Sequence, residues 1–300
     1  MNRDVIRLTA PHLPRPTRLD RVLAEAFPAW PRREIQTLVN AKRVRVNGRV
    51  VWLCSWLVST GDKIEIAGRP KREKPAALAF DRSWVIREEA DLIAVAKPEG
   101  LLSHATRAER ERNLLTMMIA AYGHLSLFHR LDRDTSGVVL FTRSIDTNRY
   151  LDTAFKEGTV EKDYLAAVAA PHELASEGVI RAPIGVDPRR RERMRVDAHA
   201  GKQALTRYAV LGEAEGMALV RLRPETGRTH QLRVHLAHFG APILGDVLYG
   251  PTPPAAPRLL LHAWRIGLPA LDGFPERRYA APPPESFLSL LPKALRALLR

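Results

Sequence analysis

Residues Phe128–Gly137 read FHRLDRDTSG and lead directly into the apolar run Val138–Phe141. The uninterrupted apolar run predicts a buried strand, so a polar loop meets the core at this point. The loop carries two carboxylates, Asp132 and Asp134, together with two arginines and a histidine. Reactive side chains placed just before a core strand are held on a rigid element, as a catalytic site requires. We therefore expect this segment to decide both the fold and the function.

Part of the loop has a purely structural explanation. Asp134–Gly137 has good turn chemistry, and Asp134 can bond to its own backbone, which is the role we assign to it. That explanation does not cover His129–Asp132, which reads HRLD. The tetrapeptide and the turn after it resemble the signature of the RluA-type RNA pseudouridine synthases.

Two further segments match the same family in the order in which it carries them. They are Glu161–Val168, EKDYLAAV, and Thr226–His235, TGRTHQLRVH. The resemblance runs from about Trp84 to Ala263 and implies an α+β protein with the pseudouridine synthase fold. That fold has a central mixed, mainly antiparallel sheet with helices and loops around it, and a cleft for RNA. Periodicity alone gives only alternating strands and helices, which is consistent with the α+β class.

The resemblance also assigns roles to site residues. It implies that Asp132 is the catalytic carboxylate, acting as nucleophile or as stabiliser of a cationic sugar. Burial disfavours a charged carboxylate and a nearby guanidinium offsets this, so an arginine partner is expected. We favour Arg233 for that partner and Arg228 for an RNA-phosphate or supporting contact, although spacing leaves the choice open. Tyr164 is expected to pack against the target base and to help remove the C5 proton, and Arg130 to enter the RNA stack.

The region before these motifs has the pattern of a small basic module. Helix-spaced apolar residues follow Thr17 from Leu19 onward, a second such stripe follows Pro31, and Asn47–Gly48 predicts a tight hairpin. Two arginines in the first turn of the second helix oppose its macrodipole, which favours an anion in front of it. The residues expected to contact RNA phosphates are Arg32, Arg33, Lys42, Arg43 and Arg45. A solvated surface is the alternative for any one of them.

This module resembles the alpha-L RNA-binding domain shared by a small-subunit ribosomal protein, tyrosyl-tRNA synthetases and many RNA-modifying enzymes. We assign residues 17–67 to it and residues 1–16 to an N-terminal extension. Residues 68–80 are charged and contain prolines, as an extended linker should. Residues 81–300 then form the pseudouridine synthase catalytic domain.

Charge and hydropathy agree with an RNA partner. The 47 Lys and Arg residues against 33 Asp and Glu give a formal net charge of +14, which favours a polyanion. Charge alone does not distinguish RNA from DNA or a membrane. No apolar run approaches the roughly 20 residues that span a bilayer, and the N-terminus lacks a secretion signal. We expect a cytoplasmic protein without a membrane partner.

Metal and cofactor chemistry are not indicated by the residues. A single cysteine, Cys54, excludes an intrachain disulfide and a two-cysteine zinc cluster. The histidines at 230, 235 and 238 lack the spacing of a metal-binding helix, so we expect no metal and no cofactor. The basic run at residues 189–195 reads as a loop or hairpin facing RNA, or else as a solvated segment.

The sequence thus predicts an isomerase that flips a uridine out of structured RNA and rebuilds its glycosidic bond through carbon. The resemblance implies a monomer, and the front module favours ribosomal RNA over transfer RNA as the target. A non-catalytic RNA-binding or ribosome-assembly protein is the first alternative. A hydrolase is the second, since Asp134–Gly137 resembles an aspartic-protease loop, but no second copy is present. A base-excising glycosidase would instead release free uracil.

Overall fold

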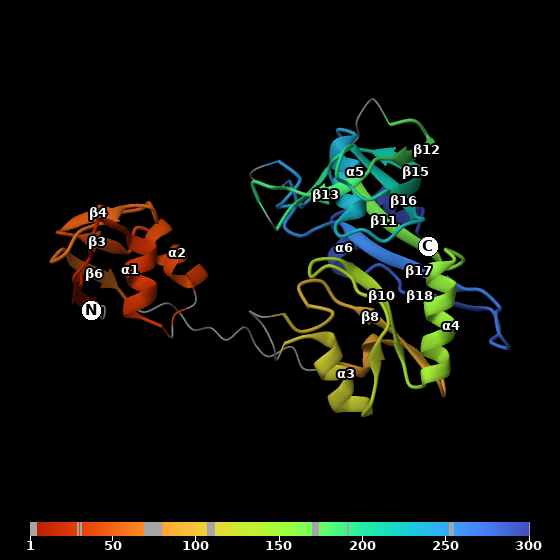
Figure 1. Ribbon diagram of the computed structural model, residues 1–300. Helices are drawn as coiled ribbons and strands as arrows, with labels where there is room; N and C mark the ends of the chain where they lie inside the picture. The colour runs from red at the N-terminus through yellow and green to blue at the C-terminus, as the bar shows by residue number, and fades with distance from the viewer. Residues whose placement is uncertain are drawn as a thin grey trace. The chain divides into compact units, whose positions relative to one another are not determined.

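The computed structural model describes residues 5–28, 30, 32–68, 80–106, 112–169, 174–190, 192–251 and 255–299, with backbone alone at 32 and 33. The chain forms two compact units, Met1–Ala77 and Leu78–Arg300 (Figure 1). No helix in these described ranges is long and apolar enough to cross a membrane.

The first unit packs two helices on a four-stranded antiparallel sheet of order β1-β6-β3-β4. Its elements are β1 (Val5–Thr9), β2 (Thr17–Arg18), α1 (Leu19–Ala26), α2 (Arg32–Asn40), β3 (Val44–Val46), β4 (Arg49–Val51), β5 (Leu57–Val58) and β6 (Lys63–Ala67). The apolar stripes expected on both helices are buried together against the sheet. Asn47 and Gly48 join β3 to β4 with φ values of 50° and 78°, as a tight hairpin turn requires. The helices and the hairpin that the sequence predicts are therefore confirmed.

Strand β1 changes the boundary of this unit. It pairs with β6 along its whole length, from Val5 opposite Ala67 to Thr9 opposite Lys63. Residues that we placed in an extension before the domain therefore supply an edge strand to its sheet. Exposed and half-buried residues alternate in β1, as expected for an edge strand.

The second unit is built on a ten-stranded sheet whose main path is β12-β15-β16-β11-β17-β10-β8-β7. Its strands are β7 (Val85–Glu88), β8 (Leu92–Lys97), β9 (Ser126–Leu127), β10 (Ser136–Thr142), β11 (Glu161–Ala169), β12 (Glu177–Arg181), β13 (Ile184–Val186), β14 (Met194–Val196), β15 (Leu205–Ala214), β16 (Met217–Pro224), β17 (Leu261–Leu268) and β18 (Arg277–Ala280). Within the described residues only β10 and β17 pair in parallel, and β13 and β14 form a separate hairpin. The expected mixed, mainly antiparallel sheet is confirmed.

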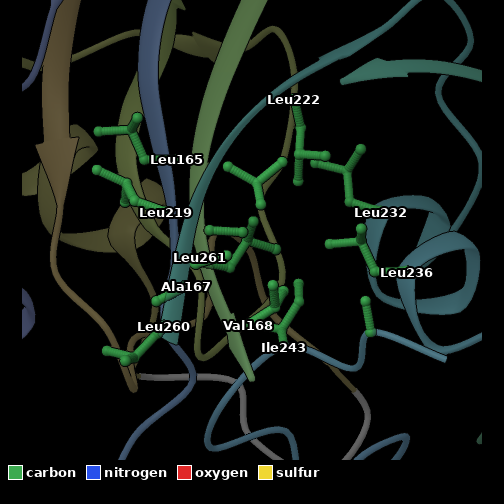
Figure 2. Close-up of a cluster of buried hydrophobic side chains, with 14 of the residues drawn as sticks. Leu165, Ala167, Val168, Leu219, Leu222, Leu232, Leu236, Ile243, Leu260 and Leu261 are labelled. Carbon is green, nitrogen blue, oxygen red and sulfur yellow. The ribbon is translucent and has the colours of Figure 1, made fainter. Parts of the chain in front are cut away.

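The helices of this unit cover the sheet. They are η1 (Arg82–Trp84), α3 (Leu114–Tyr122), α4 (Ile145–Lys156), α5 (Gln231–His238), α6 (Glu285–Leu288) and α7 (Lys293–Ala297). Figure 2 shows Leu232 and Leu236 of α5 facing Leu222 of β16, and all three belong to the largest buried cluster. Leu295 of α7 is buried in the same cluster. Packing on this core fixes α5, which carries part of the candidate site.

Strand β10 follows directly after the loop that contains Asp132 and lies inside the sheet, between β17 and β8. All seven of its residues are buried. Gly137 has a φ of 122°, and a Cβ there would lie 2.1 Å from the carbonyl oxygen of Ala263 in β17. Only glycine therefore allows the two strands to approach this closely.

We expect Gly137→Ala to destabilise the second unit by about 3 kcal/mol or more, because backbone strain adds to an overlap with a neighbouring strand. Gly158→Ala is the matched control, since Gly158 has a φ of 71° but no atom of the described chain within 4 Å of its Cβ position. It should lose only about 1 kcal/mol. The free energy of unfolding of both variants checks this, and equal losses would contradict the assigned overlap.

Candidate active site

A cleft crosses the second unit where the loop before β10 faces the start of α5. It consists of three adjoining hollows of about 90, 600 and 420 Å³, and Arg130 lines all three. Asp132 and Tyr164 both line the smallest hollow. The three motifs that resemble the family therefore meet in one place.

Asp132 presents its two carboxylate oxygens to different surroundings. Its side chain is 27% exposed, and Nη1 of Arg233 lies 3.5 Å from Oδ2. Nε2 of His230 lies 3.9 Å from the same oxygen. Among the described residues no hydrogen bond or ion pair is made to Oδ1. Oδ2 thus lies near two nitrogen-bearing side chains, whereas Oδ1 has no hydrogen bond among the described residues.

Arg233 is fixed by a second carboxylate. Its Nε and Nη2 atoms donate to Oδ2 and Oδ1 of Asp246 at 2.7 and 2.8 Å. The side chains are only 5% and 0% exposed. Burial alone would lower the pKa of Arg233, but the hydrogen bonds and charge of Asp246 outweigh it and raise that pKa above its ordinary value. A permanent, immobile positive charge therefore stands beside Asp132.

The sequence left open whether Arg228 or Arg233 pairs with Asp132, and the two arginines lie in different surroundings. Arg233 is in the first turn of α5, whereas Arg228 is exposed and its Nε donates to the carbonyl oxygen of Gln203 at 3.0 Å. The structure thus brings Arg233, and not Arg228, to Asp132. The catalytic role of that pair is still a prediction.

Tyr164 lies on β11 opposite Leu222 of β16 and Ala263 of β17. The pairing with β17 shifts register between Asp163 and Tyr164, so a bulge sits at the edge of the site. Burial, and then the negative charge of Asp132, raise the pKa of the Tyr164 hydroxyl above its usual value. The hydroxyl therefore stays protonated at neutral pH.

Lys97, the last residue of β8, makes contacts that no sequence motif predicts. The side chain is buried, and Nζ donates to the carbonyl oxygens of Pro98, Leu101 and Arg133 at 2.9, 2.8 and 2.9 Å. Burial lowers the pKa of Lys97 to about 7, and the neighbouring charges of Asp134 and Asp132 oppose that shift. Three carbonyls also match the three N–H donors of an ammonium group. A lysine at the end of an apolar strand was the signal available in the sequence.

Ser103 ties down the other side of the same loop. Its Oγ donates to the carbonyl oxygen of Leu131 at 2.8 Å and accepts the Leu131 N–H at 3.0 Å. Ser103 thus bonds the backbone just before Asp132, and Lys97 bonds the Arg133 carbonyl just after it. These bonds restrict the positions open to the Asp132 carboxylate.

Most of the basic residues expected to contact RNA are exposed where the structure describes them. Arg130 is exposed at the cleft, with Nη1 3.4 Å from Nε2 of His104. On the first unit, Lys42 and Arg45 are exposed and Arg43 is half-buried. The side chains of Arg32 and Arg33 lie outside the described residues. Their RNA contacts stay predictions.

Comparison with known proteins decides the family. A family model described as RNA pseudouridylate synthase matches residues 91–238. A ribosomal large subunit pseudouridine synthase D of Nitrosomonas europaea is 33% identical over 99% of this chain and 90% of its own length. The chain belongs to the RNA pseudouridylate synthase family. It is accordingly an RNA pseudouridine synthase, an isomerase, as the three motifs predict.

Other relatives agree with this assignment. The Escherichia coli K12 protein of the same name is 30% identical over 91% of this chain and 89% of its own length. The solved structure of human RNA pseudouridylate synthase domain containing 1 covers 71% of this chain and 93% of its own, with 25% identity and a TM-score of 0.58. An S4 domain model matches residues 17–64. The pseudouridine synthase fold and the small RNA-binding domain before it are both confirmed.

Proposed function

We propose that this pseudouridine synthase acts on uridines of large-subunit ribosomal RNA and that Asp132 is its essential carboxylate. The observation that carries the catalytic assignment is the asymmetry of Asp132. Its Oδ2 lies 3.5 Å from a buried arginine, no hydrogen bond to Oδ1 is made among the described residues, and the side chain lines the cleft. A carboxylate held in this way is oriented and still reactive.

The isomerisation needs no cofactor, and we assign its central chemical role to the Asp132 carboxylate. The bond from C1′ to N1 of uracil breaks, and a bond from C1′ to C5 of the same base forms. C5 loses a proton and N1 gains one, so no oxidant, reductant or co-reactant is consumed. We assign Oδ1 of Asp132 to attack on C1′ or to stabilisation of positive charge on the sugar. The fixed positive charge of Arg233 faces the carboxylate while the base fills the cleft and excludes water.

The remaining site residues fit the handling of a flipped base. We assign Tyr164 to packing against the uracil, because its flat ring lines the smallest hollow beside Asp132. Its raised pKa makes a resting role as proton acceptor unfavourable. We assign Arg130 to the gap left in the RNA, since it is exposed and borders every hollow of the cleft.

The target is supported by the relatives and by the S4 domain. The similar proteins of Nitrosomonas and Escherichia are named for the large ribosomal subunit, and this chain covers about nine tenths of each. The net charge of +14 suits a large folded RNA. A cytoplasmic location belongs to the same proposal, and the monomeric state stays a prediction.

A pseudouridine map of total RNA from cells lacking this protein tests the proposal. One or a few sites in large-subunit ribosomal RNA should disappear and return with the wild-type gene but not with Asp132→Asn. Loss confined to transfer RNA would refute the target, and loss of no site would refute the activity in these cells. Restoration by the asparagine variant would refute the role of Asp132.

A further inference from the structure

A chain of close contacts runs from the β13–β14 hairpin to Asp132 through Tyr249, which has no role in the function proposed above. The backbone N–H of Met194 in β14 donates to the Tyr249 hydroxyl at 2.9 Å. That hydroxyl lies 2.7 Å from Nδ1 of His230. Nε2 of the same imidazole lies 3.9 Å from Oδ2 of Asp132.

The positions of the protons follow from counting donors and acceptors. The Met194 N–H occupies one lone pair of the Tyr249 oxygen, and the phenol has one proton to donate. In the part of the chain that the structure describes, Nδ1 of His230 is the acceptor within reach of that proton. Leaving a half-buried hydroxyl without an acceptor is unfavourable, so the phenol donates to Nδ1. Burial raises the pKa of Tyr249, which keeps its proton in place.

This donation determines which nitrogen of His230 carries hydrogen. Burial lowers the pKa of His230, although Asp132 opposes the shift, so the imidazole is neutral at pH 7. A neutral imidazole that accepts at Nδ1 carries its proton on Nε2. The ring therefore turns an N–H group toward Asp132.

The backbone of His230 indicates that this orientation is imposed. Its φ is 55°, in the left-handed region that side chains other than glycine seldom adopt. Such a conformation is unfavourable by about 1 kcal/mol or more and persists where the surroundings hold it, often at functional sites. Here the Tyr249 ring meets the imidazole edge-on, at 5.6 Å between centroids and 78° between planes.

Tyr249 also contacts two arginines that belong to different parts of the site. The guanidinium of Arg193, next to β14, lies 5.0 Å from the ring centroid, and that of Arg233 lies 5.2 Å from it. Nε of Arg193 is buried without a hydrogen-bond partner among the described residues. Arg193, next to the β13–β14 hairpin, and Arg233, beside Asp132, thus both make cation–π contacts with the Tyr249 ring.

We propose that Tyr249 is a positioning residue that holds His230 with its proton on Nε2, facing Asp132, and ties this arrangement to the β13–β14 hairpin. The inference rests on the proposed role of Asp132. The 3.9 Å separation is longer than a hydrogen bond, as is common before substrate binds, and we expect it to shorten when a uridine fills the cleft. The N–H then steadies Oδ2 while Oδ1 reacts.

Nitrogen NMR of the full-length protein labelled with ¹⁵N-histidine tests the tautomer without requiring activity. His230→Gln identifies the signals of His230, which in the wild type should show a protonated Nε2 and a bare Nδ1. Tyr249→Phe should convert them to a mixture of tautomers. Tyr150→Phe is the matched control, because its hydroxyl bonds the Pro269 carbonyl at 2.6 Å, outside the network of Tyr249 and His230. A protonated Nδ1 in the wild type, or an unchanged pattern in Tyr249→Phe, would overturn the inference.

Kinetics test whether the tautomer matters to the reaction. Tyr249→Phe should lower kcat by about 10- to 100-fold, as loss of an orienting partner commonly does, with KM for the RNA within about twofold. Tyr150→Phe should change neither constant. A raised KM with unchanged kcat would make Tyr249 an RNA contact and overturn the positioning role. If the wild type itself forms no pseudouridine, the proposed function fails, and the NMR result still decides the geometry.

Discussion

Replacing Asp132 with asparagine is expected to lower the rate of pseudouridine formation by at least about 10⁴-fold. The amide has nearly the same shape, but it carries no charge and cannot serve as the nucleophile or stabilise a cationic sugar. RNA binding should be retained or strengthened, because a negative charge is removed from a cleft that binds a polyanion. Single-turnover assays on ribosomal RNA transcripts, with binding measured separately, check both expectations.

Asp134→Asn provides the comparison within the same loop. Asp134 lies two residues away, and we assigned it to the turn before β10 and not to the reaction. This variant should keep at least about a tenth of the wild-type rate. Should the two asparagine variants lose activity equally, the special position of Asp132 would be wrong.

Arg233→Gln is expected to destabilise the second unit by about 3–5 kcal/mol and to remove most activity. The reason is that Asp246, whose side chain is 0% exposed, would be left as a buried charge without its partner. Calorimetric unfolding of the whole chain, with the transition of the second unit followed separately, measures the loss. Arg233→Lys should recover part of the stability, since it restores the charge but not the paired hydrogen bonds.

Arg223→Gln is the control for burial. Arg223 makes a similar two-bond pair with Asp163 at 3.0 and 3.1 Å, but the two side chains are 41% and 12% exposed, against 5% and 0% in the Arg233 pair. Its loss should lower stability by no more than about 1 kcal/mol. Similar losses in the two variants would show that burial does not explain the importance of the Arg233 pair.

The catalytic loop could be predicted from the sequence because its chemistry is local. His129–Asp132 and the strand after it are contiguous, so the motif and the buried run identify each other. Likewise Asn113 caps α3 through its side chain, as its position before an apolar segment predicts. Arg233 was favoured by resemblance, but its separation of 101 residues from Asp132 left only the fold to bring the two together.

The residues that surround Asp132 and Arg233 could not be predicted, because only the fold brings these distant parts of the chain together. Asp246 bonds to Arg233 of α5, and the Tyr249 hydroxyl lies within hydrogen-bond distance of His230, just before that helix. Neither Asp246 nor Tyr249 stands in a sequence motif that indicates its partner. Lys97 was hidden because a charge at a strand end usually points to solvent. Strand β1 was missed because a five-residue edge strand gives a weak periodic signal.

The parallel pairing of β10 with β17 has a consequence for the order of folding during synthesis. Ser136 and His262, opposite each other in this pair, are 126 residues apart. At roughly 5–20 residues per second, β17 is made roughly 6–25 s after β10. The sheet of the S4 unit is complete by Ala67. We therefore expect the RNA-binding unit to fold first on the translating ribosome, and the nascent enzyme to gain activity only when β17 enters the sheet.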